Sequence, residues 1–260
     1  KDEWRGNPEG VRDYTAPAIR NPEDWARLPF LPPTRGHLGA QLECLRLLRK
    51  SVGSYTPILQ TIFSPLAQAK NLVGKANLQV HIRKCPAEVH AGLEEITRTT
   101  IAFLEAAIQT GIDGVFYAIQ HAQYALVSDL EFEEFGRSYD LQVLRAAQSL
   151  WLNMAHIHGS DILFETVRHY PVQILNWHDQ ETAPDLASAQ NLFSGTVCGG
   201  LRQWETLVNG NPEQVRKEAA AALLATSGKR FVLGTGCVVP VTAPHSNLLA
   251  ARQSVEKGAA

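Results

Sequence analysis

The sequence has no excess of charge of either sign. Its 260 residues include 24 lysine and arginine residues against 26 aspartate and glutamate residues, which gives a formal net charge of −2. A nucleic-acid-binding protein usually shows a basic excess, so this balance argues against nucleic acid as a partner. Hydrophobic residues make up 45% of the chain, which is too many for an intrinsically disordered protein. We therefore expect an ordinary folded protein with a small-molecule substrate.

Long apolar runs and cysteines are also scarce. No stretch approaches the roughly 20 apolar residues of a membrane helix, so we expect no membrane span. Four cysteines without a Cys-x-x-Cys pair are too few for a disulfide scaffold, and they favour a reduced, cytoplasmic setting. No signal peptide is visible, and the chain begins with Lys1, so we expect a cut or incomplete start.

Three common active-site motifs are missing as well. No Gly-x-Gly-x-x-Gly follows the first predicted strand, and the chain has no phosphate-binding Gly-x-x-x-x-Gly-Lys-Ser/Thr loop. No Gly-x-Ser-x-Gly segment is present either, which argues against the serine hydrolases that use this motif. The sequence therefore gives no support to a dinucleotide-binding fold, a P-loop enzyme or such a hydrolase.

Short apolar runs alternate with longer amphipathic segments along the chain. Such alternation, with almost continuously apolar strands, is typical of a parallel sheet covered by helices. The clearest helical segments are residues 86–110, 131–150 and 212–228, whereas residues 1–20 are predicted to be loop. The apolar runs are residues 57–63, 113–119, 152–157, 172–177, 192–198 and 231–237.

About six strand–helix units are two short of the eight in a closed barrel. An open, doubly wound sheet is the other arrangement that right-handed crossovers allow, but it lacks the motif support described above. We predict an α/β fold, a (β/α)8 TIM barrel with about the last six βα units present and the first two strands missing. We expect residues 1–260 to form a single domain of this kind.

The carboxyl ends of the predicted strands carry the candidate site residues, because barrel chemistry lies at that face. His156 and His158 are two residues apart on one strand and therefore face the same side. Cys237 ends a later strand, and two imidazoles with one thiolate and an open position make an acceptable catalytic zinc site. Alternatively, the two histidines only bond to their neighbours and line a polar pocket.

Other polar and aromatic side chains also follow the predicted strands. His178 is a candidate general base or fourth metal ligand, whereas Asp179 is more readily explained as a cap of the following helix. Tyr117, Gln120 and His121 would bind polar groups of a substrate, although Tyr117 equally suits the barrel interior. Trp177 would form an aromatic wall or simply pack. All of these residues lie at or just after the ends of the predicted strands.

Several stretches resemble the uroporphyrinogen decarboxylase superfamily. The resemblance runs from about residue 21 onward and implies a (β/α)8 barrel whose first two strands are absent here. The superfamily contains uroporphyrinogen decarboxylases, corrinoid-linked methyltransferases and cobalamin-independent methionine synthase. The stretches that carry it are residues 57–72 (PILQTIFSPLAQAKNL), 111–121 (GIDGVFYAIQH), 174–179 (ILNWHD), 192–201 (LFSGTVCGGL) and 231–249 (FVLGTGCVVPVTAPHSNLL).

The resemblance also separates two branches of this superfamily. The decarboxylases carry an Arg-Gln-Ala-Gly-Arg-Tyr segment and a pyrrole-binding aspartate, neither of which is in this chain. Phe63 stands where they have a pocket tyrosine, and Cys237 approximately where they have a histidine. The methyltransferases carry zinc on a His-x-Cys-Gly strand end and a later cysteine. This pattern resembles His156-Ile157-His158-Gly159 followed by Cys237, with His158 in place of a cysteine.

The resemblance to the methyltransferase branch implies zinc on His156, His158 and Cys237. His178 and Gln120 would then line the substrate site, with Phe63 nearby in the family pattern. A corrinoid on a partner protein would serve as methyl donor or acceptor for a thiol. The alternatives are a cofactor-free uroporphyrinogen III decarboxylase and a degenerate, non-catalytic barrel. A homodimer would cover the sheet edges that an incomplete barrel exposes.

Overall fold

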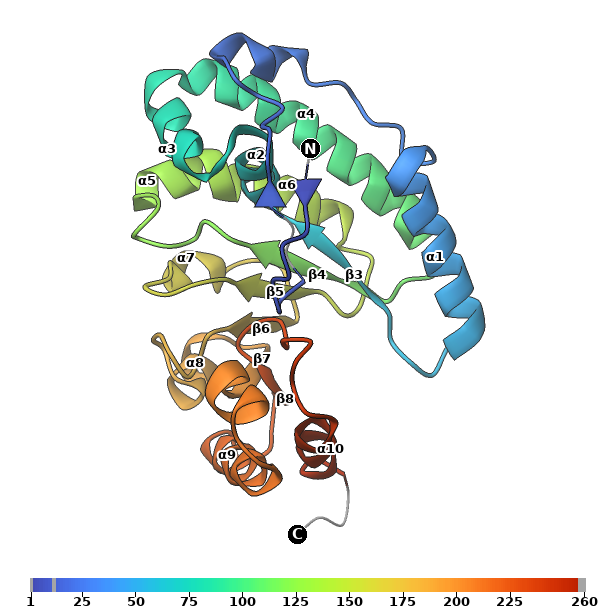
Figure 1. Cartoon of the computed structure of the whole chain (residues 1–260), viewed down its shortest axis with the longest axis vertical. Coiled ribbons are helices and arrows are strands. Elements are labelled where there is room, and N and C mark those ends of the chain that lie inside the picture. The colour runs from blue at the N-terminus through green and yellow to red at the C-terminus, as the bar shows by residue number, and fades with distance from the viewer. Residues whose placement is uncertain (1, 11–12, 257–260) are drawn as a thin grey trace. The chain divides into compact units, whose positions relative to one another are not determined.

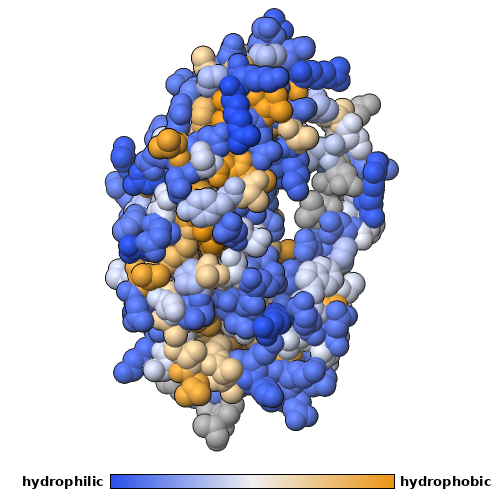
Figure 2. Space-filling model, turned by 90° about the vertical axis from the view of Figure 1, so that its left-hand side faces the viewer, coloured by the Kyte–Doolittle hydropathy of each residue, from blue (hydrophilic) through white to orange (hydrophobic). Residues whose placement is uncertain are grey.

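A computed structural model describes residues 2–10 and 13–256 of the chain. The chain divides into two compact units, which we treat separately. The C-terminal unit comprises Lys1–Thr15, His156–His169 and Ile174–Ala260, and the N-terminal unit comprises Ala16–Ala155 and Tyr170–Gln173. Figure 2 shows a largely polar face on which apolar side chains form separate patches. Among the described residues, none of the helices has the length and apolarity needed to cross a membrane.

Six parallel strands follow one another in chain order in the sheet, β3-β4-β5-β6-β7-β8 (Figure 1). Five of the six predicted apolar runs contain one of these strands, and the run 192–198 overlaps only the first half of β7 (Thr196–Leu201). The predicted α/β class and number of units are confirmed. These strands are recognisable in the sequence because a strand covered by helices on both faces is apolar at almost every position. The strands are β3 (Leu59–Phe63), β4 (Gly114–Ile119), β5 (Met154–Ile157), β6 (Ile174–Trp177), β7 (Thr196–Leu201) and β8 (Phe231–Thr235).

The N-terminal unit packs its helices around β3 and β4, which pair in parallel with Leu59 opposite Gly114. Trp25 is fully buried in this unit, and its Nε1 donates to His81 Nδ1 at 2.9 Å. A Cβ at Gly92 would lie 2.3 Å from the Trp25 ring, so glycine is needed where the tryptophan crosses α4. The helices are η1 (Pro22–Arg27), α1 (Gly36–Val52), α2 (Pro65–Val73), α3 (Lys75–Lys84), α4 (Pro86–Ile108), α5 (Asp129–Phe132), η2 (Glu133–Arg137) and α6 (Ser138–Ala146).

The segment predicted as one helix over residues 131–150 is instead three consecutive elements. A single turn of π-helix, η2, separates α5 from α6. A Cβ at Gly136 would lie 2.6 Å from the Phe132 ring, so the wider turn coincides with a close contact that only glycine permits. Local widening of this kind is invisible to helical periodicity, because the apolar face continues through it.

The C-terminal unit places β6, β7 and β8 beside α8, α9 and α10 (Figure 1). Val197 of β7 lies opposite Phe231 of β8, and Ile174 of β6 lies opposite Thr196. The predicted start of α9 is confirmed, because the Asn211 side chain accepts from the N–H groups of Glu213 and Gln214. The helices of this unit are α7 (Phe164–Val167), α8 (Leu186–Leu192), η3 (Gln203–Val208), α9 (Pro212–Ala225) and α10 (His245–Gln253).

The prediction of loop over residues 1–20 is wrong at two places. β1 (Asp2–Glu3) and β2 (Asp13–Tyr14) form a short antiparallel pair, with Asp2 opposite Tyr14. Two-residue strands are too short to show an alternating pattern, so the sequence gives no strand signal there. Pro8, between the two strands, is also held within this unit, since its carbonyl oxygen accepts from Val241 N–H at 2.9 Å.

Candidate metal centre

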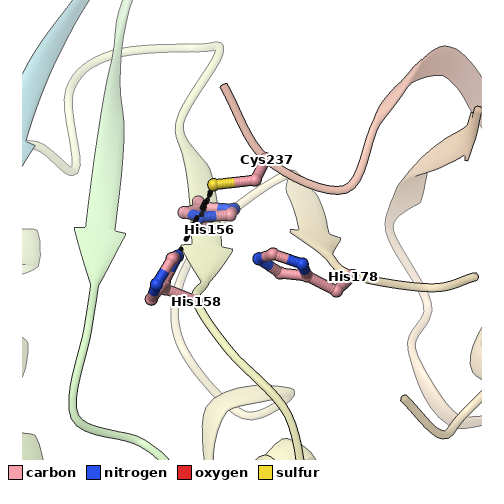
Figure 3. Close-up of side chains that lie close together, drawn as sticks. All are labelled: His156, His158, His178 and Cys237. Carbon is pink, nitrogen blue, oxygen red and sulfur yellow. Dashed lines mark hydrogen bonds between the residues drawn. The ribbon is translucent and has the colours of Figure 1, made fainter. Parts of the chain in front are cut away.

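Three imidazoles and one thiol gather in the C-terminal unit (Figure 3). His156 and His158 come from the end of β5, His178 directly follows β6, and Cys237 lies two residues after β8. Each side chain offers one ligand atom, and these atoms all lie within 4.8 Å of one another. The structure therefore brings together the three residues predicted as metal ligands, with His178 as a fourth.

The spacing of the donor atoms fits a tetrahedral metal ion. Cys237 Sγ lies 3.7 Å from His156 Nε2 and 3.5 Å from His158 Nδ1. Around tetrahedral zinc, with Zn–S of about 2.3 Å and Zn–N of about 2.0–2.1 Å, a sulfur and a nitrogen are about 3.5 Å apart. The existing side-chain positions would thus need only small shifts to hold such an ion.

His178 independently indicates that a group binds at the centre of the cluster. Its Nε2 is buried and has no hydrogen-bond partner among the described residues, whereas its Nδ1 lies 3.4 Å from Glu181 Oε2. A buried polar atom without a partner costs about 1–3 kcal/mol, so such atoms are uncommon in folded proteins. A metal ion or a substrate group at the centre of the cluster would supply the missing partner.

Burial sets the protonation of two members of the cluster. It lowers the pKa of His156 to about 3, although the hydrogen bond with Asn176 opposes this, so the imidazole is neutral at neutral pH. Burial also raises the pKa of the Cys237 thiol, and Glu9 and Glu181 add to that effect. A neutral imidazole is ready to bind a cation, whereas the thiol must release its proton to do so.

A glycine lets the loop that carries Cys237 approach His178. A Cβ at Gly236 would lie 2.6 Å from His178 Cα and 3.0 Å from Trp177 O, and both are backbone atoms that cannot swing away. Thr235 Oγ1 also donates to Cys237 O at 2.5 Å, which holds the turn after β8. The close approach of two backbones therefore places the thiol over the histidines.

Trp177 and Asp179, which flank His178, have structural partners in the C-terminal unit. Trp177 is fully buried, its Nε1 donates to Pro184 O at 2.9 Å, and its ring meets Phe164 edge-on at 5.2 Å. A substrate role for Trp177 stays a prediction. The capping role expected for Asp179 is wrong, because Asp185 caps α8 and Asp179 accepts from Gly200 N–H.

The other predicted substrate residues belong to the N-terminal unit. Tyr117 is fully buried, and its hydroxyl donates to Asp140 Oδ1 at 2.7 Å. Gln120 Oε1 accepts from Lys70 Nζ at 3.0 Å, His121 is buried, and Phe63 is 41% exposed. Their roles at a substrate stay predictions. The sequence did not predict the contact between Lys70 and Gln120, because a lysine on a helix gives no indication of its hydrogen-bond partner.

Comparison with known proteins finds relatives in both branches of the expected superfamily. A methylcobamide:CoM methyltransferase, MtbA of Methanosarcina acetivorans, is 24% identical over 238 residues, covering 88% of this chain and 67% of the relative. A uroporphyrinogen decarboxylase of Chlorobium phaeobacteroides is 24% identical over 258 residues, covering 93% and 71%. Sequence identity therefore does not separate the two reactions.

Solved structures share the fold. A methyltransferase from Methanosarcina mazei superposes with a TM-score of 0.74 at 22% identity, covering 85% of this chain and 65% of that one. A B12-independent methionine synthase from Shewanella sp. gives a TM-score of 0.59 at 14% identity, covering 84% and 65%. The chain thus spans about two thirds of the length of these proteins. The sequence profile described as uroporphyrinogen decarboxylase (URO-D) matches residues 8–258. This chain therefore belongs to the uroporphyrinogen decarboxylase family.

Proposed function

We propose that this protein is a zinc-dependent methyltransferase that holds the metal on His156, His158 and Cys237. The observation that carries the proposal is the spacing of the donors, with Cys237 Sγ 3.5 Å and 3.7 Å from the two imidazole nitrogens. The name of the MtbA relative, a methylcobamide:CoM methyltransferase, supports a methyl group carried on a corrinoid and an acceptor thiol. The corrinoid would be held by a partner protein.

The chain's own residues would bind and orient the acceptor. Bound zinc would supply Lewis acidity, which lowers the pKa of a coordinated thiol so that it is a thiolate near neutral pH. Of the four clustered side chains, only Cys237 brings a negative charge, so the site would remain net positive with a divalent ion. A more positive site favours the thiolate form but reduces its nucleophilicity.

His178 would act at the open position of this site. Its ring centroid lies 5.2 Å from that of His158 and 6.1 Å from that of His156, so it faces the same space (Figure 3). From there its buried Nε2 would receive the proton that an incoming thiol releases, or would complete the ligand set when no substrate is bound. Both roles use the same unpartnered atom.

The second candidate function is cofactor-free uroporphyrinogen decarboxylation. Decarboxylase relatives of 23–27% identity cover much of the chain and favour it. The reaction gives no reason for a half-buried thiol beside a cluster of imidazoles, so we place it second. A binding protein without activity is the remaining outcome.

Metal content tests the proposal first. Protein purified without added metal should contain about one zinc ion per chain by elemental mass spectrometry, as expected for a single site. Cys237→Ser and His158→Gln should lose most of it. Cys85→Ser is the matched control, because Cys85 is a buried free thiol of the N-terminal unit.

Activity assays then separate the two reactions. The zinc-loaded chain should demethylate methylcobalamin in the presence of small thiols, followed by the change in corrinoid absorbance, and Cys237→Ser should not. Absence of bound zinc even after incubation with the metal would overturn the proposal. Turnover of uroporphyrinogen III by the metal-free chain would establish the second candidate instead.

A further inference from the structure

We infer that Asn176 is a positioning residue that fixes the tautomer and the orientation of His156. Asn176 lies on β6, is 4% exposed, and contacts the cluster without contributing a donor to it. Its amide oxygen lies 2.7 Å from His156 Nδ1. For the metal, this inference rests on the proposed function, whereas the hydrogen on His156 Nδ1 follows from the hydrogen bonds alone.

The two ends of the Asn176 amide are assigned by their partners. Nδ2 lies 2.9 Å from both Cys198 O and Thr235 O, and backbone carbonyl oxygens only accept hydrogen bonds. The end that faces them must therefore be the NH2 group, with both of its hydrogens used. The carbonyl oxygen of the amide is then forced toward His156.

This assignment determines where the His156 proton resides. An amide oxygen only accepts, so Nδ1 must donate to it and carries the hydrogen. A neutral imidazole has one such hydrogen, which leaves the lone pair on Nε2. That atom is the one that lies 3.7 Å from Cys237 Sγ. Asn176 thus directs the metal-binding nitrogen at the cluster.

The same side chain also links the elements that carry the ligands. Thr235 is the last residue of β8 and lies two positions before Cys237, while His156 lies on β5. One buried amide thereby joins the histidine ring to the strand that leads to the thiol. Groups that orient a metal-bound histidine through its second nitrogen typically change metal affinity about 10- to 100-fold when removed.

Nitrogen NMR of ¹⁵N-histidine-labelled protein tests this directly. Long-range proton–nitrogen correlations, assigned with His156→Gln, should show His156 protonated at Nδ1, both as purified and after chelation. Asn176→Leu, similar in volume but unable to form hydrogen bonds, should populate the other tautomer and weaken zinc binding about 10- to 100-fold in competition with a chromophoric chelator. Asn176→Asp keeps an acceptor for Nδ1 and should retain the tautomer.

Asn247→Leu is the matched control in the same unit. Asn247 is 1% exposed and also donates to backbone carbonyls, those of Leu207 and Gly210. Its loss should lower stability without changing the His156 tautomer or zinc affinity. A wild-type His156 protonated at Nε2, or an Asn176→Leu protein with unchanged tautomer and affinity, would overturn the inference. Failure of the wild type to bind zinc would overturn only the proposed function.

Discussion

Outside the metal cluster, Asp140 is a buried carboxyl group whose pKa is strongly raised. It is fully buried in the N-terminal unit and accepts from the hydroxyls of Tyr117 and Tyr170 at 2.7 Å and 2.8 Å. Burial, the largest cause, raises its pKa to about 7, although both hydroxyl donors oppose the shift. A carboxyl group with this pKa is protonated in the folded protein at mildly acid pH.

The raised pKa predicts that folding stability falls as the pH rises. Between the ordinary value of 3.8 and about 7, the folded state binds a proton that the unfolded state has released. The free energy of unfolding should therefore decrease across this window, by at most about 1.4 kcal/mol per pH unit from this group. Urea unfolding of wild type and Asp140→Asn from pH 4 to pH 8 checks it. Parallel pH profiles for the two proteins would contradict the assignment.

At the scale of elements, the ends of β6 and β8 must approach closely for the cluster to form. The close contact at Gly236 involves the backbone of His178 and Trp177, so neighbouring side chains cannot relieve it. By contrast, a Cβ at Gly234 on β8 would meet only Cys198 Sγ, at 2.9 Å. Substitution of each glycine in turn therefore distinguishes an effect of the close backbone approach from an effect of crowding around β8.

Gly236→Ala should displace the loop that carries Cys237 and lower zinc affinity by more than about tenfold, the lower end of the effect of a lost supporting contact. Gly234→Ala should cost less, because a side-chain sulfur can shift. Zinc competition with a chromophoric chelator measures both, and circular dichroism confirms that each variant is folded. Equal affinities for the two variants would show that the backbone approach does not hold the thiol in place.

Helical periodicity predicted the longer helices of both units, and it failed where the chain changes helix type. The segment 86–110 contains α4 and the segment 212–228 contains α9, each begun by a proline at its first turn. The segment 131–150 was resolved into three elements, because a π-turn preserves the apolar face that the pattern reports. The π-turn coincides with the close Phe132–Gly136 contact, which joins residues that the pattern treats as one continuous helix.

At the scale of the whole molecule, the four clustered side chains connect β5, β6 and β8 within the C-terminal unit. An ion bound by all of them would stabilise the folded unit, because the unfolded chain cannot assemble the same ligand set. The N-terminal unit contributes none of these four side chains. Metal binding should therefore stabilise the C-terminal unit more than the N-terminal unit.

Zinc removal is expected to increase amide hydrogen exchange mainly in the C-terminal unit. The effect should be largest in β5, β6 and β8, which lead to the four clustered side chains, and small in α4 of the N-terminal unit. Hydrogen-exchange mass spectrometry of the zinc-loaded and chelated protein measures it peptide by peptide. Cys237→Ser should resemble the chelated wild type under both conditions. Uniform changes throughout the chain would argue against a local site.

The sequence by itself determined the six strands, the α/β class and the shared face of His156 and His158, because these depend on local alternation. Only the tertiary structure decided that His178 joins Cys237, 59 positions later, and that Asn176 faces His156. It also decided that the Tyr117 hydroxyl is used by Asp140. Residues distant in sequence meet through strand order and close backbone approach, which no local pattern records.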